Sequence, residues 1–260
     1  MTPVSALLNR HRSIRRFKPD AVDPELVREV LGDAIAGSAS SGNLNCVSIV
    51  VTRDAERKRR LYELHFEQPM VLQASLVVTY CADWYRTRQW LARYGARDNF
   101  DNLIGYHVAA FDAMIVAQNA CLGFQAHGLG ICYMGTTLHS MTEIARFLEL
   151  PDTCVPVTTT VVGWPDEDPE KRERLPLSAI VHDERYRQPT VEEVDAIHAE
   201  REALFRERYA ASPELRARID RSGAESLAQY YTSKAKYDPD VFRQDSARLA
   251  ALLAAKHFLP

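Results

Sequence analysis

The sequence lacks the signatures of several common protein classes. None of its five cysteines forms a C-x-x-C pair, so neither a zinc ribbon nor a C-x-x-C redox motif is present. Its 32 basic and 35 acidic side chains give a net charge of −3, which offers no general attraction to nucleic acid or to an anionic membrane. The opening MTPVSALLNRHRSIRRF places its basic residues after a short apolar stretch, so we expect no signal peptide there.

Several catalytic motifs are missing as well. The chain contains no G-x-S-x-G, no H-E-x-x-H and no P-loop, which disfavours triad hydrolysis, metal catalysis and phosphate binding by a P-loop. The most apolar long segment, Ile104 to Ala126, is interrupted by Asp112 and by several other polar residues. A buried helix is therefore expected there rather than a membrane span.

What is present is typical of a globular protein. The 260 residues are 46% apolar and 26% charged, which suits one large domain or two small ones. The odd number of cysteines in apolar surroundings favours reduced thiols and a cytoplasmic location. No internal repeat and no low-complexity linker divides the chain.

Hydrophobic periodicity predicts alternating strands and helices. Helices are expected over 24–36, 54–64, 102–127 and 142–148, and buried strands over 46–52, 75–81 and 155–162. The form of 84–102 is uncertain, and from Val191 onward the pattern is helical and poor in large apolar residues. These elements predict an α/β or α+β sandwich, with a core over 1–190 and a helical arm over 191–260 that packs on a homodimer partner.

Four segments contain residues suited to ligand binding. The first, HRSIRRF from His11, clusters arginines with a hydroxyl, which match the oxygens of a phosphate. The second, from Ser38 to Asn45, holds hydroxyls and amides that can bond a polar heterocycle. Taken singly, the first segment is better interpreted as a surface patch paired with carboxylates, and the second as a solvated turn.

The other two segments lie later in the chain. In GLGICYMGTT, from Gly128, Gly135 would let a backbone amide approach a flat ligand. The segment is not G-x-G-x-x-G and follows a helix, so a Rossmann site is not supported; alone it reads as a helix end and a tight turn. Arg172 and Arg174 follow Gly163-Trp-Pro165 and could close over a phosphate or form a solvated loop.

Together, in this order, the four segments resemble the nitroreductase family of FMN-dependent oxidoreductases over about residues 1 to 186. The similarity is closest to the NADPH-dependent branch of oxygen-insensitive nitroreductases and flavin reductases. It implies an α+β fold, a three-layer α-β-α sandwich with a mainly antiparallel central sheet and a helical C-terminal arm. It also implies a homodimer with FMN at the subunit interface.

The resemblance further implies roles for individual residues. The phosphate and ribityl chain of FMN would meet His11, Arg12, Ser13 and Arg15, with Arg172 and Arg174 reaching the phosphate from the far loop. The partner subunit would bring Ser40, Ser41 and Asn43. The ring would meet Gln68 at its polar edge and Tyr133, Met134, Gly135 and Thr136 along its face. No catalytic side chain and no metal are expected, because the flavin carries the chemistry.

The implied reaction is two-electron transfer from NADPH or NADH to nitroaromatics, quinones or flavins in a ping-pong cycle. Leu138 stands where the branch usually carries an arginine, and lysines replace arginines near Tyr230. The sequence therefore supports FMN binding more strongly than it supports a preference for NADPH over NADH. Two alternatives remain: a specialised FMN oxidase or dehydrogenase of a dedicated metabolite, and a flavin-binding protein without turnover. Nucleic-acid binding through HRSIRR is disfavoured.

Overall fold

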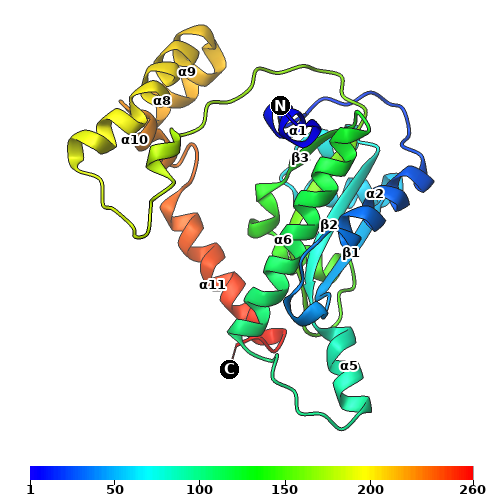
Figure 1. Cartoon of the computed structure of the whole chain (residues 1–260). Helices are drawn as coiled ribbons and strands as arrows, with labels where there is room; N and C mark the ends of the chain where they lie inside the picture. Colours follow the sequence, from blue (N-terminus) through cyan, green and yellow to red (C-terminus); the bar gives the residue numbers. More distant parts are fainter. Residues whose placement is uncertain (260) are drawn as a thin grey trace. The chain divides into compact units, whose positions relative to one another are not determined.

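The computed structural model describes residues 1–259, apart from the side chain of Ala210 (Figure 1). It divides into two compact units. The first comprises Met1–Lys171 together with the segment from Ala247 onward, and the second comprises Arg172–Ser246. The expected core ended at residue 190, whereas this division lies at Lys171.

A four-stranded sheet in the order β1-β2-β4-β3 forms the centre of the first unit. Its strands are β1 (Val47–Thr52), β2 (Leu76–Asp83), β3 (Gly130–Tyr133) and β4 (Cys154–Gly163), and each neighbouring pair is antiparallel. The expected α+β fold with an antiparallel sheet is confirmed.

Helices cover both faces of the sheet, which gives the expected three layers (Figure 1). On one face, α2 (Pro24–Ala36) and α6 (Leu103–Ala126) pack on Leu76, Val78 and Tyr80 of β2. On the other face, α3 (Ala55–Leu64), α4 (Met70–Gln73) and α7 (Met141–Phe147) surround Val77. Every residue of β2 is buried, because a central strand with apolar residues on both faces is covered from both sides.

Local signals set several helix ends. The Asp23 side chain accepts from the Glu25 amide at the start of α2 and Asp54 accepts from the Arg57 amide at the start of α3, as N-cap residues do. Asn102 caps α6 in the same way, and Gly128 after its end has φ +80, a conformation that favours glycine. The expected bounds of α2 are confirmed.

Two expectations about strands are wrong. Residues 128–137 read as a helix end and a turn, yet Gly130–Tyr133 forms strand β3, which is too short for its period to show in the sequence. The first predicted strand is only half-buried rather than buried, because β1 lies at the edge of the sheet. Its partner on one side is β2, and the described residues place no strand on the other.

Helix α6 is long and apolar enough to cross a membrane by length and composition alone. It packs on α2 and along the sheet, where Ala113, Ala117, Ala120 and Phe124 are buried. The helix is therefore part of the core of the first unit. Its remaining face exposes large apolar side chains, namely Leu103, Ile104, Phe111, Met114 and Ile115.

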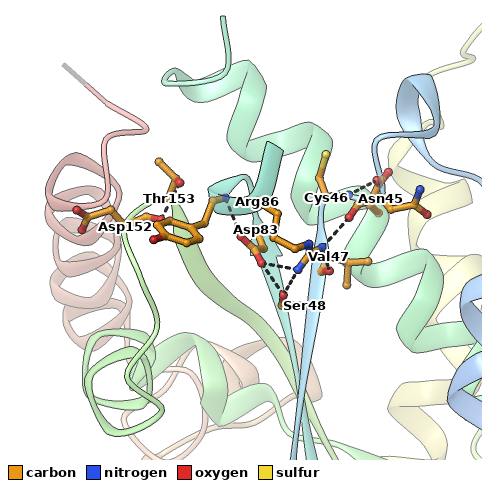
Figure 2. A network of polar contacts seen from close by, with 10 residues as sticks. Asn45, Cys46, Val47, Ser48, Asp83, Arg86, Asp152 and Thr153 are labelled. Atoms are coloured by element: carbon orange, nitrogen blue, oxygen red, sulfur yellow. Dashed lines mark hydrogen bonds and ion pairs between the residues drawn. The ribbon is translucent and has the colours of Figure 1, made fainter. Parts of the chain in front are cut away.

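The uncertain segment after β2 contains helix α5 (Tyr85–Arg93). Trp84 just before it is fully buried, stacks on Phe100 with ring centroids 3.9 Å apart, and donates to the carbonyl of Gly105 at 2.7 Å. Figure 2 shows Arg86 joining the Asp83 carboxylate to the start of β1. This aromatic stretch therefore supports the core at one end of the sheet.

The second unit is helical, with α8 (Val191–Ala211), α9 (Pro213–Ser222), α10 (Leu227–Tyr231) and the beginning of α11 (Pro239–Ala255). Phe205, Ile219 and Tyr230 form a small buried cluster within it. The region thus has a modest core of its own, although the sequence pattern showed little sign of one. The described residues also include a first helix, α1 (Pro3–Arg10), and three short 3-10 helices, Ser41–Asn43, Gly135–His139 and Leu177–Ala179.

Candidate functional site

The segment His11–Phe17 runs beside the edge strand β3. Ser13 pairs with Ile131 in a parallel bridge, and the Ile14 amide donates to the Ile131 carbonyl at 2.9 Å. Ile14 and Phe17 are buried, so the apolar members of the segment anchor it while its polar members face outward. A Cβ at Gly130 would stand 2.8 Å from the Ile14 side chain, so this close approach requires glycine.

An acidic loop meets this basic segment. Arg12 forms an ion pair with Asp168, and Arg16 lies 3.4 Å from Glu167. The Glu167 carboxylate also accepts the backbone amides of Arg15 and Arg16 at 2.5 and 3.1 Å. Among the described residues, no carboxylate is paired with the Arg15 guanidinium, which is exposed. Arg15 is therefore the cation of this segment that is most available to a ligand.

A hollow of about 250 Å³ opens at this end of β3, lined in part by Arg12, Ile14 and Gly130. Gln125 of α6 also lines it and lies 3.0 Å from Nδ1 of His11. Of the residues predicted in this segment, Arg12 lines the hollow and His11 contacts the lining residue Gln125, whereas Ser13 and Arg15 are not among the lining residues.

The other end of β3 leads into the 3-10 helix that starts at Gly135. Gly135 is exposed, and a Cβ placed on it would meet no atom within 4 Å. Tyr133 is half-buried with its hydroxyl 3.4 Å from Gln118, while the side chain of Met134 is buried in the core. The Met134 side chain therefore does not face a ligand, and its backbone amide donates to the Thr159 carbonyl at 2.8 Å. The open surface at Gly135 admits a flat molecule.

The turn that follows α3 packs against this 3-10 helix. Gln68 Nε2 donates to the Thr136 hydroxyl at 3.4 Å, and Nδ1 of His65 lies 2.8 Å from the same oxygen. His65 is fully buried, and burial lowers its pKa to about 4, since desolvation disfavours the charged imidazolium. The structure thus joins the predicted Gln68 directly to the predicted Thr136, and the same hydroxyl contacts a histidine that the sequence gave no reason to single out.

The Ser40–Asn43 loop is held elsewhere on α6. Asp112, 2% exposed, accepts from the Ser40 hydroxyl at 2.6 Å, the Ser41 amide at 3.3 Å and the Cys46 amide at 3.1 Å. Sequence reasoning did not use Asp112 in this way, although a lone carboxylate in an apolar helix is a signal of a buried polar contact. Ser41 and Asn43 are exposed.

Within one chain, the predicted site residues lie in two groups at different positions along α6. Along α6, Asp112 contacts the Ser40 loop and Gln125 contacts His11. At 1.5 Å per residue these contacts are roughly 20 Å apart along the helix axis. The loop and the basic segment therefore do not meet around a single depression within one chain.

Arg172 and Arg174 lie in the second unit and are exposed there. Between them, Glu173 pairs with Arg208 at 3.0 Å, and this guanidinium lowers the pKa of Glu173 to about 2. Their predicted approach to a phosphate stays a prediction.

Several known proteins are similar to this chain in sequence or in fold. The sequence model described as the nitroreductase family matches residues 8–164. An FMN reductase (NADPH) of Bacillus subtilis is 32% identical over 185 residues, which cover 70% of this chain and 74% of that protein. An oxygen-insensitive NADPH nitroreductase of Salmonella typhimurium is 32% identical over 207 residues, covering 79% and 83%. The solved structure of NfrA1 nitroreductase from B. subtilis superposes with a TM-score of 0.84 at 25% identity, covering 98% of each chain.

Proposed function

The chain belongs to the nitroreductase family, and from that premise we propose that it reduces flat electron acceptors such as nitroaromatics, quinones or flavins in a ping-pong cycle. Its class follows from the family: it is an FMN-dependent oxidoreductase that uses NAD(P)H. We further propose that it acts as a cytoplasmic homodimer, in keeping with the buried free cysteines.

The observation that carries this proposal is the pair of sites at the two ends of β3. At one end, the segment that contains His11, Ser13 and the exposed Arg15 pairs with Ile131 of β3, and Arg15 is available for a phosphate. At the other end Gly135 is open, with Thr136 and Gln68 beside it. Cations at one end and an uncovered backbone with polar donors at the other fit a molecule with a phosphate tail and a flat polar ring, as FMN has.

The protein's residues bind and orient the cofactor. Arg15 and Ser13 would hold the phosphate, Gln68 and Thr136 the polar ring edge, and the Gly135 amide the ring face. When bound, FMN supplies the two-electron transfer between NAD(P)H and the acceptor. Fixed donors near the ring stabilise negative charge that develops on reduction, because they need no reorganisation.

Two features support the homodimer. The Ser40–Asn43 loop lies roughly 20 Å along α6 from the basic segment, so it would complete a flavin site only from a second subunit. The exposed face of α6 carries Ile104 at 73% exposure and Phe111 at 62%, and a contiguous apolar face of this kind marks an interface. A second copy of the chain is the simplest occupant.

Leu138 favours a second candidate within the same class. It is 55% exposed beside the open Gly135, where an arginine would be expected to read the 2′-phosphate of NADPH. The enzyme would then be a specialised FMN oxidase or dehydrogenase that takes its electrons from a dedicated metabolite. A flavin-binding protein without turnover is the remaining alternative.

The deciding experiment is the visible spectrum of the FMN-loaded protein under anaerobic conditions, before and after each nicotinamide nucleotide. We expect the flavin absorbance to bleach with NADPH or NADH and to recover when a quinone or nitroaromatic is added. Bleaching without recovery would argue against these acceptors. Bound flavin that neither nucleotide bleaches would favour the specialised oxidase or the binding protein, and absence of bound flavin would contradict the flavin site.

A further inference from the structure

A buried histidine lies beneath the open end of the proposed flavin site. His65 is fully buried at the end of α3, with Nδ1 2.8 Å from the Thr136 hydroxyl oxygen. Gln68 Nε2 donates to that same oxygen at 3.4 Å. The other ring nitrogen of His65, Nε2, is buried and has no hydrogen-bond partner among the described residues.

The number of protons in this cluster is limited. A threonine hydroxyl has one proton to donate and two positions that accept, whereas a neutral imidazole carries one proton on one of its two nitrogens. A proton on Nε2 of His65 would be a buried donor with no acceptor. A proton on Nδ1 is bonded to Thr136, and Nε2 is left as an unpartnered acceptor. Buried N–H groups without a partner are rarer in proteins than under-satisfied acceptors, so the geometry favours Nδ1–H.

This tautomer determines what Thr136 can do. With Nδ1–H of His65 and Nε2–H of Gln68 both donating, the two accepting positions of the hydroxyl are filled. Its single proton is then free for a third group. The neighbouring residue Gly135 faces open space, so a ligand lying there can accept this proton.

We propose that His65 is a positioning residue which, with Gln68, makes the Thr136 hydroxyl an obligatory donor to the flavin ring. This inference rests on the proposed function. A fixed donor at the ring binds the more negative, reduced cofactor better than the oxidised one. The pair would therefore raise the reduction potential of the bound flavin as well as its affinity.

The first test measures the midpoint potential of bound FMN in the holoenzyme. Thr136→Val keeps the shape of the side chain and removes its proton. We expect it to weaken binding of reduced FMN roughly tenfold more than that of oxidised FMN, which lowers the two-electron midpoint potential by about 30 mV. Thr52→Val is the matched control, since Thr52 is a buried threonine on β1, the edge strand opposite β3, and should leave the potential unchanged.

Variants of His65 test whether it acts through Thr136. His65→Leu should lower the potential as Thr136→Val does, and the double variant should go no lower. His65→Asn should restore the wild-type value, because an asparagine amide stands where Nδ1 of histidine does; it also keeps a polar group if leucine prevents folding. A shift in Thr136→Val that His65→Leu and the double variant do not reproduce would overturn the role of His65.

The tautomer can be read without the cofactor. Long-range ¹H–¹⁵N correlation spectra of the FMN-free protein, with the His65 signals assigned by their loss in His65→Asn, should show the proton on Nδ1. A proton on Nε2 would overturn the inference. The inference would also be overturned if Thr136→Val and His65→Leu bound FMN and left its midpoint potential unchanged. A wild-type protein that binds no FMN would instead overturn the proposed function itself.

Discussion

The Asp112 carboxylate on α6 accepts a hydrogen bond from the Ser40 hydroxyl at 2.6 Å while only 2% of Asp112 is exposed. The same carboxylate holds the amides of Ser41 and Cys46. One buried charge therefore fixes the conformation of a loop whose exposed residues we propose to complete the flavin site of a partner subunit.

Replacing Asp112 should destabilise the fold. Asp112→Asn replaces either Oδ1, which accepts from the Ser41 amide, or Oδ2, which accepts from the Ser40 hydroxyl and the Cys46 amide, with an amide donor. At least one hydrogen bond to a charged group is then lost, and a buried donor faces another donor. We expect the free energy of unfolding to fall by about 2 kcal/mol, measured by urea denaturation. Asp101→Asn, at an exposed aspartate, should change it by less than about 0.5 kcal/mol; equal effects would contradict the buried network.

Two glycine substitutions should act in opposite directions. Gly130→Ala places a Cβ 2.8 Å from Ile14, so it should displace the basic segment, weaken FMN binding and cost about 1–3 kcal/mol of stability. Gly32→Ala adds a Cβ within α2 where nothing lies within 4 Å, and should stabilise by about 0.5–1 kcal/mol. Thermal unfolding measures the stability of each variant, and FMN titration measures its affinity. Unaltered FMN binding in Gly130→Ala would show that FMN does not bind at the basic segment beside Gly130.

The arginines of the basic segment should differ in their importance. Arg15→Gln removes an exposed cation that has no carboxylate partner among the described residues, so FMN affinity should drop about tenfold or more. Arg16→Gln removes a cation already paired with Glu167, and should change affinity less than threefold, because exposed ion pairs contribute little. Fluorescence titration of FMN ranks the two, and the reverse ranking would place the phosphate elsewhere.

Stability should depend on the protonation of His65. Its pKa is lowered from 6.5 to about 4 in the folded chain, so between these values the unfolded chain binds a proton that the folded chain does not. The folded state is fully favoured above pH 6.5 and loses about 3 kcal/mol as the pH falls through this window. Urea midpoints across it should fall less steeply for His65→Asn than for wild type; parallel curves would show that His65 does not titrate in this way.

The exposed face of α6 should control assembly. Phe111→Arg places a charge on this apolar surface, so the homodimer should dissociate and lose FMN affinity, because the Ser40 loop would no longer reach a partner's site. Light scattering and FMN titration measure both. Ile35→Arg, on the 43% exposed Ile35 of α2, should leave the mass unchanged, and a Phe111→Arg dimer with normal affinity would argue against this interface.

Much of the architecture could be predicted from the residues themselves. The period of apolar residues and the Asp23 cap specified α2 to its ends, and β-branched runs indicated three of the four strands. Strand β3 could not be predicted, since its four residues adopt strand geometry by pairing with β4 rather than through their own pattern.

The candidate site shows the same division. The sequence alone was enough to identify the residues that carry the resemblance to the family, because the resemblance rests on the types and order of the arginines, glycines and amide side chains along the chain. Only the tertiary structure decided that the guanidinium groups of Arg12 and Arg16 meet carboxylates while that of Arg15 meets none among the described residues. It alone also decided that His65 contacts Thr136, and that Asp112 holds Ser40 on a distant part of α6. Those contacts join residues far apart in the chain, and a hydrogen bond or ion pair forms only where folding brings donor and acceptor within about 3 Å of each other.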